Sequence, residues 1–188
     1  MCLTLANANK SIEDRDKNNV QVMVGYMRRF APAFIEAVEE VKKIEKINYA
    51  RIRDIIGLNH LFIEQSQNVF RFNDIPKEAI ADRSNRSRKM VHEAIGDVPR
   101  EIRNAYGLLC GLSSHDLSAM RELIGFPKRV VSAIPWNEGS YISAIFEFDD
   151  FCAVFETGVD KQRRFDAHLE VFSDTKQIKI QYIIMVKG

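Results

Sequence analysis

The order of hydrophobic and polar residues in the first quarter of the chain predicts two helices and two strands. Thr4 to Asn19 carries apolar residues at helical spacing, with Thr4 as a suitable N-cap and the Asn18-Asn19 pair as its end, which indicates a surface helix. Val20–Val24 is a short apolar run that predicts a buried strand. Pro32 begins a second helix, and Ile47–Ile56 is expected to form a strand.

The periodicity fades between residues 57 and 100. Asp82–Lys89 (DRSNRSRK) is charged, and four of its residues are basic. A phosphate or nucleic-acid contact is one interpretation, but no aromatic residues are interleaved there, as they are on surfaces that bind single strands. We therefore expect a solvated loop or a mobile lid.

Asn104–Ile124 is the most helix-like segment, and the chain after it is strand-like. Gly107 and Gly111 lie four residues apart, so one side of this helix lacks side chains. Alternation of apolar and polar residues predicts four strands, which are Tyr141–Phe148, Phe151–Glu156, Phe165–Phe172 and Gln177–Ile184. Helices packed on one face of a largely antiparallel open sheet are expected, which is the α+β class.

The composition narrows the class of protein. The chain has 188 residues, of which 46% are hydrophobic, and its formal charge is +1. A near-neutral balance argues against a nucleic-acid partner, which attracts a basic excess. Cys2, Cys110 and Cys152 are widely spaced and fit reduced thiols. With no signal-peptide pattern and no apolar run of membrane-spanning length, we expect a cytoplasmic protein with no membrane partner.

The familiar motifs for nucleotides, zinc and nucleophilic serine are missing from this sequence, which has no G-x-G-x-x-G, C-x-x-C, H-E-x-x-H or G-x-S-x-G. His115 is the most informative single residue, because it lies one turn after Gly111 in an otherwise apolar helix. It is either a buried histidine that a backbone carbonyl satisfies or a general acid/base in a pocket. Tyr26, Arg28 and Arg29 follow a predicted strand, so they form either a ligand-binding loop or a surface ion-pair cluster.

Several stretches resemble the Gfo/Idh/MocA family of oxidoreductases. Val22–Phe30 (VMVGYMRRF) is similar to the stretch that ends that family's Rossmann domain. Gly107–Gly125 is similar to its helix with an Asp-x-x-x-His pair, and His115 matches the histidine. Glu156-Thr157-Gly158 and Leu169-Glu170-Val171 look like later strand signatures, and the spelling around His115 looks most like fungal members. The resemblance implies a substrate-binding domain that forms homodimers through the open face of its sheet.

Departures from the family pattern change the functional expectation. Gly111 stands where the family has the aspartate, and the family's G-x-G-x-x-G and Glu-Lys-Pro motifs have no counterpart. Residues 1–24 look like a remnant helix and strand of a lost nucleotide-binding domain, and residues 25–188 look like the α+β substrate-binding and dimerisation domain. We expect no cofactor, no metal and no measurable NAD(P)H binding.

The resemblance and its departures lead to three functional hypotheses. The first is a cofactor-independent, non-redox enzyme of the isomerase, cyclase or lyase type that acts on a small organic molecule, such as a secondary metabolite. The second is an oxidoreductase subunit that borrows a partner's Rossmann domain, and the third is a non-catalytic binding or scaffold module. The catalytic candidate is His115, and the candidate substrate-binding residues are Tyr26, Met27, Arg28, Arg53, Gly111 and Ser114.

Overall fold

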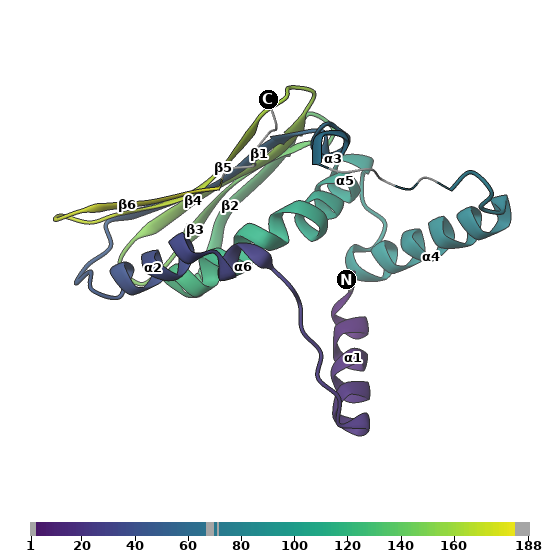
Figure 1. The fold of residues 1–188 in the computed structure, drawn as a ribbon, viewed down its shortest axis with the longest axis horizontal. Coiled ribbons are helices and arrows are strands. Elements are labelled where there is room, and N and C mark those ends of the chain that lie inside the picture. Colours follow the sequence, from purple (N-terminus) through teal and green to yellow (C-terminus); the bar gives the residue numbers. More distant parts are fainter. Residues whose placement is uncertain (1–2, 67–69, 71, 183–188) are drawn as a thin grey trace.

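Six strands form one open sheet, and helices pack on one of its faces (Figure 1). The computed structural model describes residues 3–66, 70 and 72–182. The strand order is β2-β3-β4-β1-β5-β6; β1 and β4 are parallel, and the other neighbouring pairs are antiparallel. The predicted α+β class is confirmed. The elements are α1 (Leu5–Asn18), the 3₁₀ turn η1 (Met27–Phe30), α2 (Pro32–Val41), β1 (Tyr49–Gly57), α3 (Asn59–Ser66), α4 (Lys77–Ile95), α5 (Arg100–Leu108), the π turn η2 (Leu109–Ser113), α6 (Ser114–Ile124), β2 (Arg129–Trp136), β3 (Tyr141–Glu147), β4 (Cys152–Asp160), β5 (Phe165–Phe172) and β6 (Gln177–Tyr182).

The hydrophobic core lies between α2, α6 and the inner face of the sheet. Phe34 of α2 is fully buried and Met120 of α6 is 2% exposed, and the sheet contributes Ile52, Phe155 and Leu169, each 1% exposed. Alternate residues of β3 point into this layer, as their spacing predicts, because successive side chains of a strand face opposite sides. The inner face of the sheet is therefore the surface against which α6 packs.

The N-terminal helix is confirmed, but the strand predicted after it is wrong. Thr4 caps α1 by accepting a hydrogen bond from the Asn7 backbone N–H at 3.0 Å. Val20–Val24 is not part of the sheet, and its valines and Met23 are 52–73% exposed. An apolar run becomes a strand only beside a sheet edge that can pair with it, and this segment leads away from the sheet to α1 (Figure 1).

Residues 77–95 form a helix where a loop or lid was expected, so that prediction is wrong. Pro76 precedes α4, and Gly96 ends it with a φ of 73°. Ion pairs one turn apart support the exposed surface, as between Arg86 and Asp82 at 2.8 Å. Charged residues with good helix propensity outweigh the weak apolar stripe, which is why hydrophobic periodicity alone missed this helix.

The predicted helix from Asn104 to Ile124 is present, but it begins earlier and contains a π turn. It starts at Arg100, and η2 separates α5 from α6. Four strands are found near their predicted positions, while the end of the predicted Gln177–Ile184 strand lies outside the described residues. β2 was not singled out from the sequence, because this edge strand contains Pro135 and a β-bulge instead of clean alternation.

The turn between β2 and β3 lies directly against α5. Gly139 has a φ of 80°, and a Cβ there would lie 2.3 Å from the Glu101 backbone oxygen and 2.7 Å from the Ala105 nitrogen. Asn104 also donates from Nδ2 to the Glu138 carbonyl at 2.8 Å. Only a residue without a side chain fits this close approach.

Gly139→Ala should lower the free energy of unfolding by about 2 kcal/mol or more, because it adds both a steric overlap and backbone strain. Gly107→Ala is the matched control: it lies in α5, its Cβ would meet nothing within 4 Å, and it should stabilise the protein by up to about 1 kcal/mol. Chemical denaturation measures both changes. Equal effects at the two positions would contradict the close packing at this turn.

Candidate functional site

Arg28 joins three elements at the centre of the candidate site. Its Nη1 binds Asp54 Oδ2 of β1 at 3.0 Å and also Asp116 Oδ1 of α6. Both carboxylates are fully buried, and the Arg28 side chain is 11% exposed. The segment reaches this position because Tyr26 adopts a left-handed backbone conformation, with a φ of 35°, just before η1. Such a conformation costs a residue with a side chain about 1 kcal/mol, and the surrounding contacts must offset it.

The two carboxylates come from positions that the local sequence places toward the interior. Asp54 lies between Ile52 and Ile56 on the inward face of β1. Asp116 lies in the first turn of α6, directly after the π turn, and is fully buried there. Burial raises the pKa of Asp116 well above its usual range, and the hydrogen bond and charge of Asp54 raise it further.

Aromatic rings close the remaining sides of the guanidinium group. The Arg28 Cζ atom lies 4.8 Å from the centre of the Tyr182 ring and 5.6 Å from that of Phe165. Such cation–π contacts are strongest where water is excluded. Burial also raises the pKa of Tyr182.

His115 lies beside this ion-pair cluster and packs against Tyr26. The two rings meet edge to face, with their centres 5.7 Å apart. His115 Nδ1 is buried and has no hydrogen-bond partner within the described part of the chain. Burial lowers the pKa of His115, and the positive charge of Arg28 lowers it further. The imidazole is therefore neutral near pH 7 and can accept a proton.

A hydroxyl pair fixes the π turn that precedes His115. Ser113 Oγ donates to Thr157 Oγ1 of β4 at 3.0 Å, and both residues are buried. The next residue, Ser114, has a buried Oγ without a partner among the described residues. π turns are frequent at functional sites because the extra residue redirects the side chains that follow.

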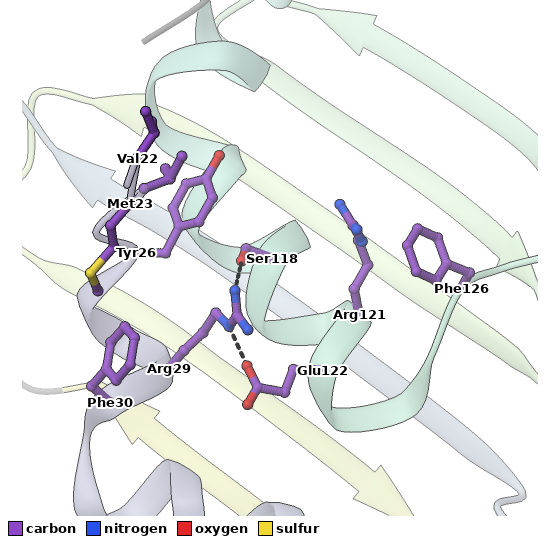
Figure 2. A pocket seen from close by; sticks show the side chains of 10 residues that line it. Val22, Met23, Tyr26, Arg29, Phe30, Ser118, Arg121, Glu122 and Phe126 are labelled. Carbon is purple, nitrogen blue, oxygen red and sulfur yellow. Dashed lines mark hydrogen bonds and ion pairs between the residues drawn. The ribbon is translucent and has the colours of Figure 1, made fainter. Parts of the chain in front are cut away.

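Two cavities lie along the outer side of α6 and share Tyr26, Ser118 and Arg121. The larger has a volume of about 730 Å³ and is bounded by Met23, Phe30 and Phe126 among other residues (Figure 2). The smaller, of about 300 Å³, is lined by Ser114, Cys110 and two leucines. His115 is not among the lining residues of either cavity, and it contacts them through the Tyr26 ring.

Arg29 forms part of the wall of the larger cavity. It contacts Glu122 through Nε and Ser118 through Nη1, the latter at 3.3 Å (Figure 2). Arg121 lies over the ring of Phe126, with its Cζ atom 4.1 Å from the ring centre. The cavity therefore combines apolar walls, two hydroxyl groups and guanidinium groups, which suits a small polar organic molecule better than a purely apolar one.

The structure brings together some of the residues proposed from the sequence and not others. Tyr26, Ser114 and His115 lie together, with Arg28 beneath them. Met27 is 68% exposed. Gly111 is also exposed: it lines neither cavity, and a Cβ there would meet nothing within 4 Å. Arg53 is on the opposite face of the sheet, bound to Glu156 at 3.0 Å and to Asp166 at 2.7 Å.

Sequence reasoning missed Asp54 and Asp116. An aspartate at an inward position of an apolar strand requires a buried partner, so Asp54 could have been found from the alternation of β1. Asp116 follows His115 directly but gives no comparable signal. Within residues 3–66, 70 and 72–182, no cluster of three or more His, Cys, Asp or Glu residues is arranged to hold a metal ion. The described helices also include none with the length and apolar character of a membrane span.

Comparison with known proteins identifies the fold. No protein-family model matches the sequence, and no curated protein is significantly similar to it. Among solved structures, the fold is similar to myo-inositol 2-dehydrogenase from Lactobacillus plantarum, with a TM-score of 0.61 and 17% identity over 95% of this chain and 47% of that one. It is also similar to scyllo-inositol dehydrogenase from Lactobacillus casei, solved with NAD(H) and scyllo-inositol, with a TM-score of 0.53 and 19% identity over 87% of this chain and 42% of that one.

A third similar structure is a probable dehydrogenase from Thermotoga maritima, with a TM-score of 0.59 and 17% identity over 96% of this chain and 48% of that one. This chain thus spans about half the length of the three dehydrogenases. It shares the fold of the part of these structures that it covers, and this is the fold that the resemblance of its motifs implies.

His115 should titrate below its ordinary value of about 6.5, because both burial and Arg28 disfavour its charged form. The unfolded chain then binds a proton that the folded chain does not, so His115 should reduce stability as the pH falls through about 6.5 toward its lowered pKa. NMR titration measures the pKa of the imidazole, whose signals are assigned by their absence in His115→Gln. The loss of stability at low pH is measured as the difference in unfolding free energy between wild type and His115→Gln at several pH values. Titration at or above the ordinary value would contradict this electrostatic environment.

Proposed function

We propose that this chain is a substrate-binding domain for a small organic molecule, with His115 as the group that transfers a proton to or from it. The observation that carries the proposal is a neutral, partly buried imidazole whose buried Nδ1 has no partner in the described chain, and which packs against Tyr26, a residue that lines two cavities. A buried polar atom of this kind is normally satisfied by a ligand, by water or by another protein group. A neutral histidine beside a cavity suits general base catalysis.

The reaction we favour is a non-redox one, in which His115 removes a proton during isomerisation, elimination or cyclisation. Nearby hydroxyl groups, from Tyr26, Ser114 and Ser118, would orient oxygen atoms of the substrate. The apolar walls of the larger cavity would hold the carbon skeleton, and fixed orientation of the reacting groups contributes to the rate.

A second candidate function is the substrate half of an NAD(P)-dependent dehydrogenase. It is favoured by the similar structures, which are dehydrogenases. It is also favoured by the exposed apolar segment Val20–Val24, a surface of the kind that another domain or chain covers. In such an enzyme a bound NAD(P)⁺ would accept the hydride from the substrate carbon, and His115 would accept the hydroxyl proton.

Replacement of His115 by alanine should reduce turnover by about 10²–10⁴-fold without unfolding the protein, because a positioned base is lost. Turnover is measured without cofactor as loss of exchangeable C–H signals from a panel of small hydroxy ketones in D₂O. His92→Ala on the exposed side of α4 is the matched control and should be as active as wild type. Circular dichroism verifies folding.

Other outcomes of these assays separate the two functions. A loss of less than about tenfold in His115→Ala, together with inactivity of Ser118→Leu, which adds bulk to the wall shared by both cavities, would exclude proton transfer by His115 and favour a template that acts by shape. Oxidation of scyllo-inositol only when NAD⁺ is added, or an NAD(P)H dissociation constant below about 100 μM, would favour the dehydrogenase. A silent protein that binds none of these compounds would favour the scaffold hypothesis.

We also propose that the chain forms a homodimer through the sheet face opposite the helices. Apolar residues of β2 and β3 are exposed on this face, with Ile134 at 61%, Trp136 at 43% and Ile145 at 38%. The centre of the same face carries the ion pairs of Arg51 and Arg53 with Glu156. A sheet face that only meets water does not need exposed apolar side chains of this size, so their presence favours a face that another copy of the chain covers.

Sedimentation at concentrations on the order of tens of micromolar should show a dimer, and Ile145→Lys should convert it to a monomer, since it places a charge in the apolar part of the interface. Phe126→Lys is the control, because Phe126 is an exposed apolar residue that lies beyond α6 on the helical side. A monomeric wild type at these concentrations would contradict the proposed dimer.

A further inference from the structure

Two oxygen atoms beneath His115 lack a donor. Asp54 Oδ1 and Asp116 Oδ2 are buried, and neither has a hydrogen-bond partner when both groups are treated as carboxylates. The other oxygen of each group binds the same atom, Nη1 of Arg28. The two carboxyl groups, called the carboxyl pair below, are therefore held together by one guanidinium nitrogen.

The charges around the carboxyl pair do not balance if both groups are ionised. In the described chain, Arg28 is the only residue that forms an ion pair with either group. The other titratable neighbours, His115 of α6 and Tyr182 of β6, are both held in their neutral forms by burial. Two buried carboxylates and one guanidinium would leave a net negative charge in the protein interior, which is strongly unfavourable.

We propose that Asp54 and Asp116 hold one proton between them, so that with Arg28 they form a neutral unit that positions Tyr26 and His115. The proton adds a hydrogen-bond donor to a pair of side chains that would otherwise offer only acceptors, two of them without a partner. We place the proton on Asp116, because burial raises the pKa of this group. Asp54 is then the ionised member of the carboxyl pair, and its negative charge balances the positive charge of Arg28.

The unit acts on the site in two ways. Arg28 fixes η1, and thereby Tyr26 two residues earlier, whose ring packs against His115. A neutral Asp116 also adds no negative charge beside the imidazole, so the lowered pKa of His115 is preserved. Asp54, Asp116 and Arg28 are positioning residues in this proposal, and only the link to catalysis rests on the proposed function.

A double-mutant cycle tests the shared proton through thermal stability. Asp54→Asn or Asp116→Asn alone leaves one carboxylate for Arg28, and the amide replaces the protonated partner, so each should lower Tm by only a few degrees. The double variant leaves a buried guanidinium without a carboxylate, and its Tm should fall on the order of 10 °C further than the sum of the single changes. Additive losses would overturn the proposal.

The chain offers a matched control on the opposite face of the sheet. Arg53 also binds two carboxylates, from Glu156 and Asp166, but these are partly exposed, and arginine partners lower both of their pKa values despite some burial. Both are ionised, so Glu156→Gln and Asp166→Asn should have effects close to additive. The same coupling in both cycles would show that the coupling does not report a shared proton.

A second measurement covers the case in which the double variant does not fold. Because the folded pKa of Asp116 is raised, stability that is present below its ordinary value of 3.8 is lost as the pH rises toward the raised value. Asp116→Asn does not titrate, so it should gain stability relative to wild type as the pH rises above about 4. A difference that stays constant from acid to neutral pH would overturn the proposal.

The pKa of His115 in the Asp116→Asn variant reports the charge of Asp116 directly, which a measurement of stability alone does not. Asp116→Asn exchanges one neutral group for another, so the NMR-measured pKa of His115 should stay unchanged. A clear decrease would show that Asp116 is charged in the native protein, and would overturn the proposal. None of these measurements uses a substrate, so they give an answer even if the proposed function is wrong.

Discussion

The contact of Arg28 with Asp54 and Asp116 is the interaction on which the rest of the site depends. It connects the turn before α2, the central strand β1 and the start of α6, and the rings of Phe165 and Tyr182 enclose it. Removing Arg28, the only positive charge of this cluster, would leave buried carboxyl groups without a partner, a kind of change that usually costs about 3–5 kcal/mol. Arg28 lies two residues after Tyr26, so the same contact helps to hold Tyr26 against His115.

The helix that carries His115 is fixed at both ends by different kinds of contact. At the π turn, a hydroxyl pair between Ser113 and Thr157 attaches it to β4. Farther along, Met120 and Leu123 bury in the core above the sheet. Apolar burial holds the helix against the sheet without specifying its rotation, whereas the polar contacts are directional and select one rotation. The side chains at the start of α6 are thus set by a few hydrogen bonds within a generic hydrophobic layer.

The sequence predicts an element correctly where interactions between residues close in the chain determine it. The cap at Thr4 and the alternation in Phe165–Phe172 predicted elements that the structure contains. The pattern failed for Val20–Val24, because strand formation needs a neighbouring edge that no local window contains. It also failed for the ion-pair cluster, because Arg28 meets its partners across 26 and 88 residues of sequence. His115 is singled out by its place in an apolar helix and by the resemblance, but the electrostatics around that residue required the three-dimensional structure.

The parallel pairing of β1 with β4 at the middle of the sheet has a consequence for how the chain folds. Arg53 and Glu156 are neighbours in this pair although 103 residues separate them. The β2–β3–β4 meander can form from nearby residues, but the sheet is complete only after β1 joins it across a long closed loop, at an entropic cost that local contacts do not repay. A topology with such distant partners at its centre is expected to fold slowly, with β4 exposing an unpaired inner edge until β1 arrives.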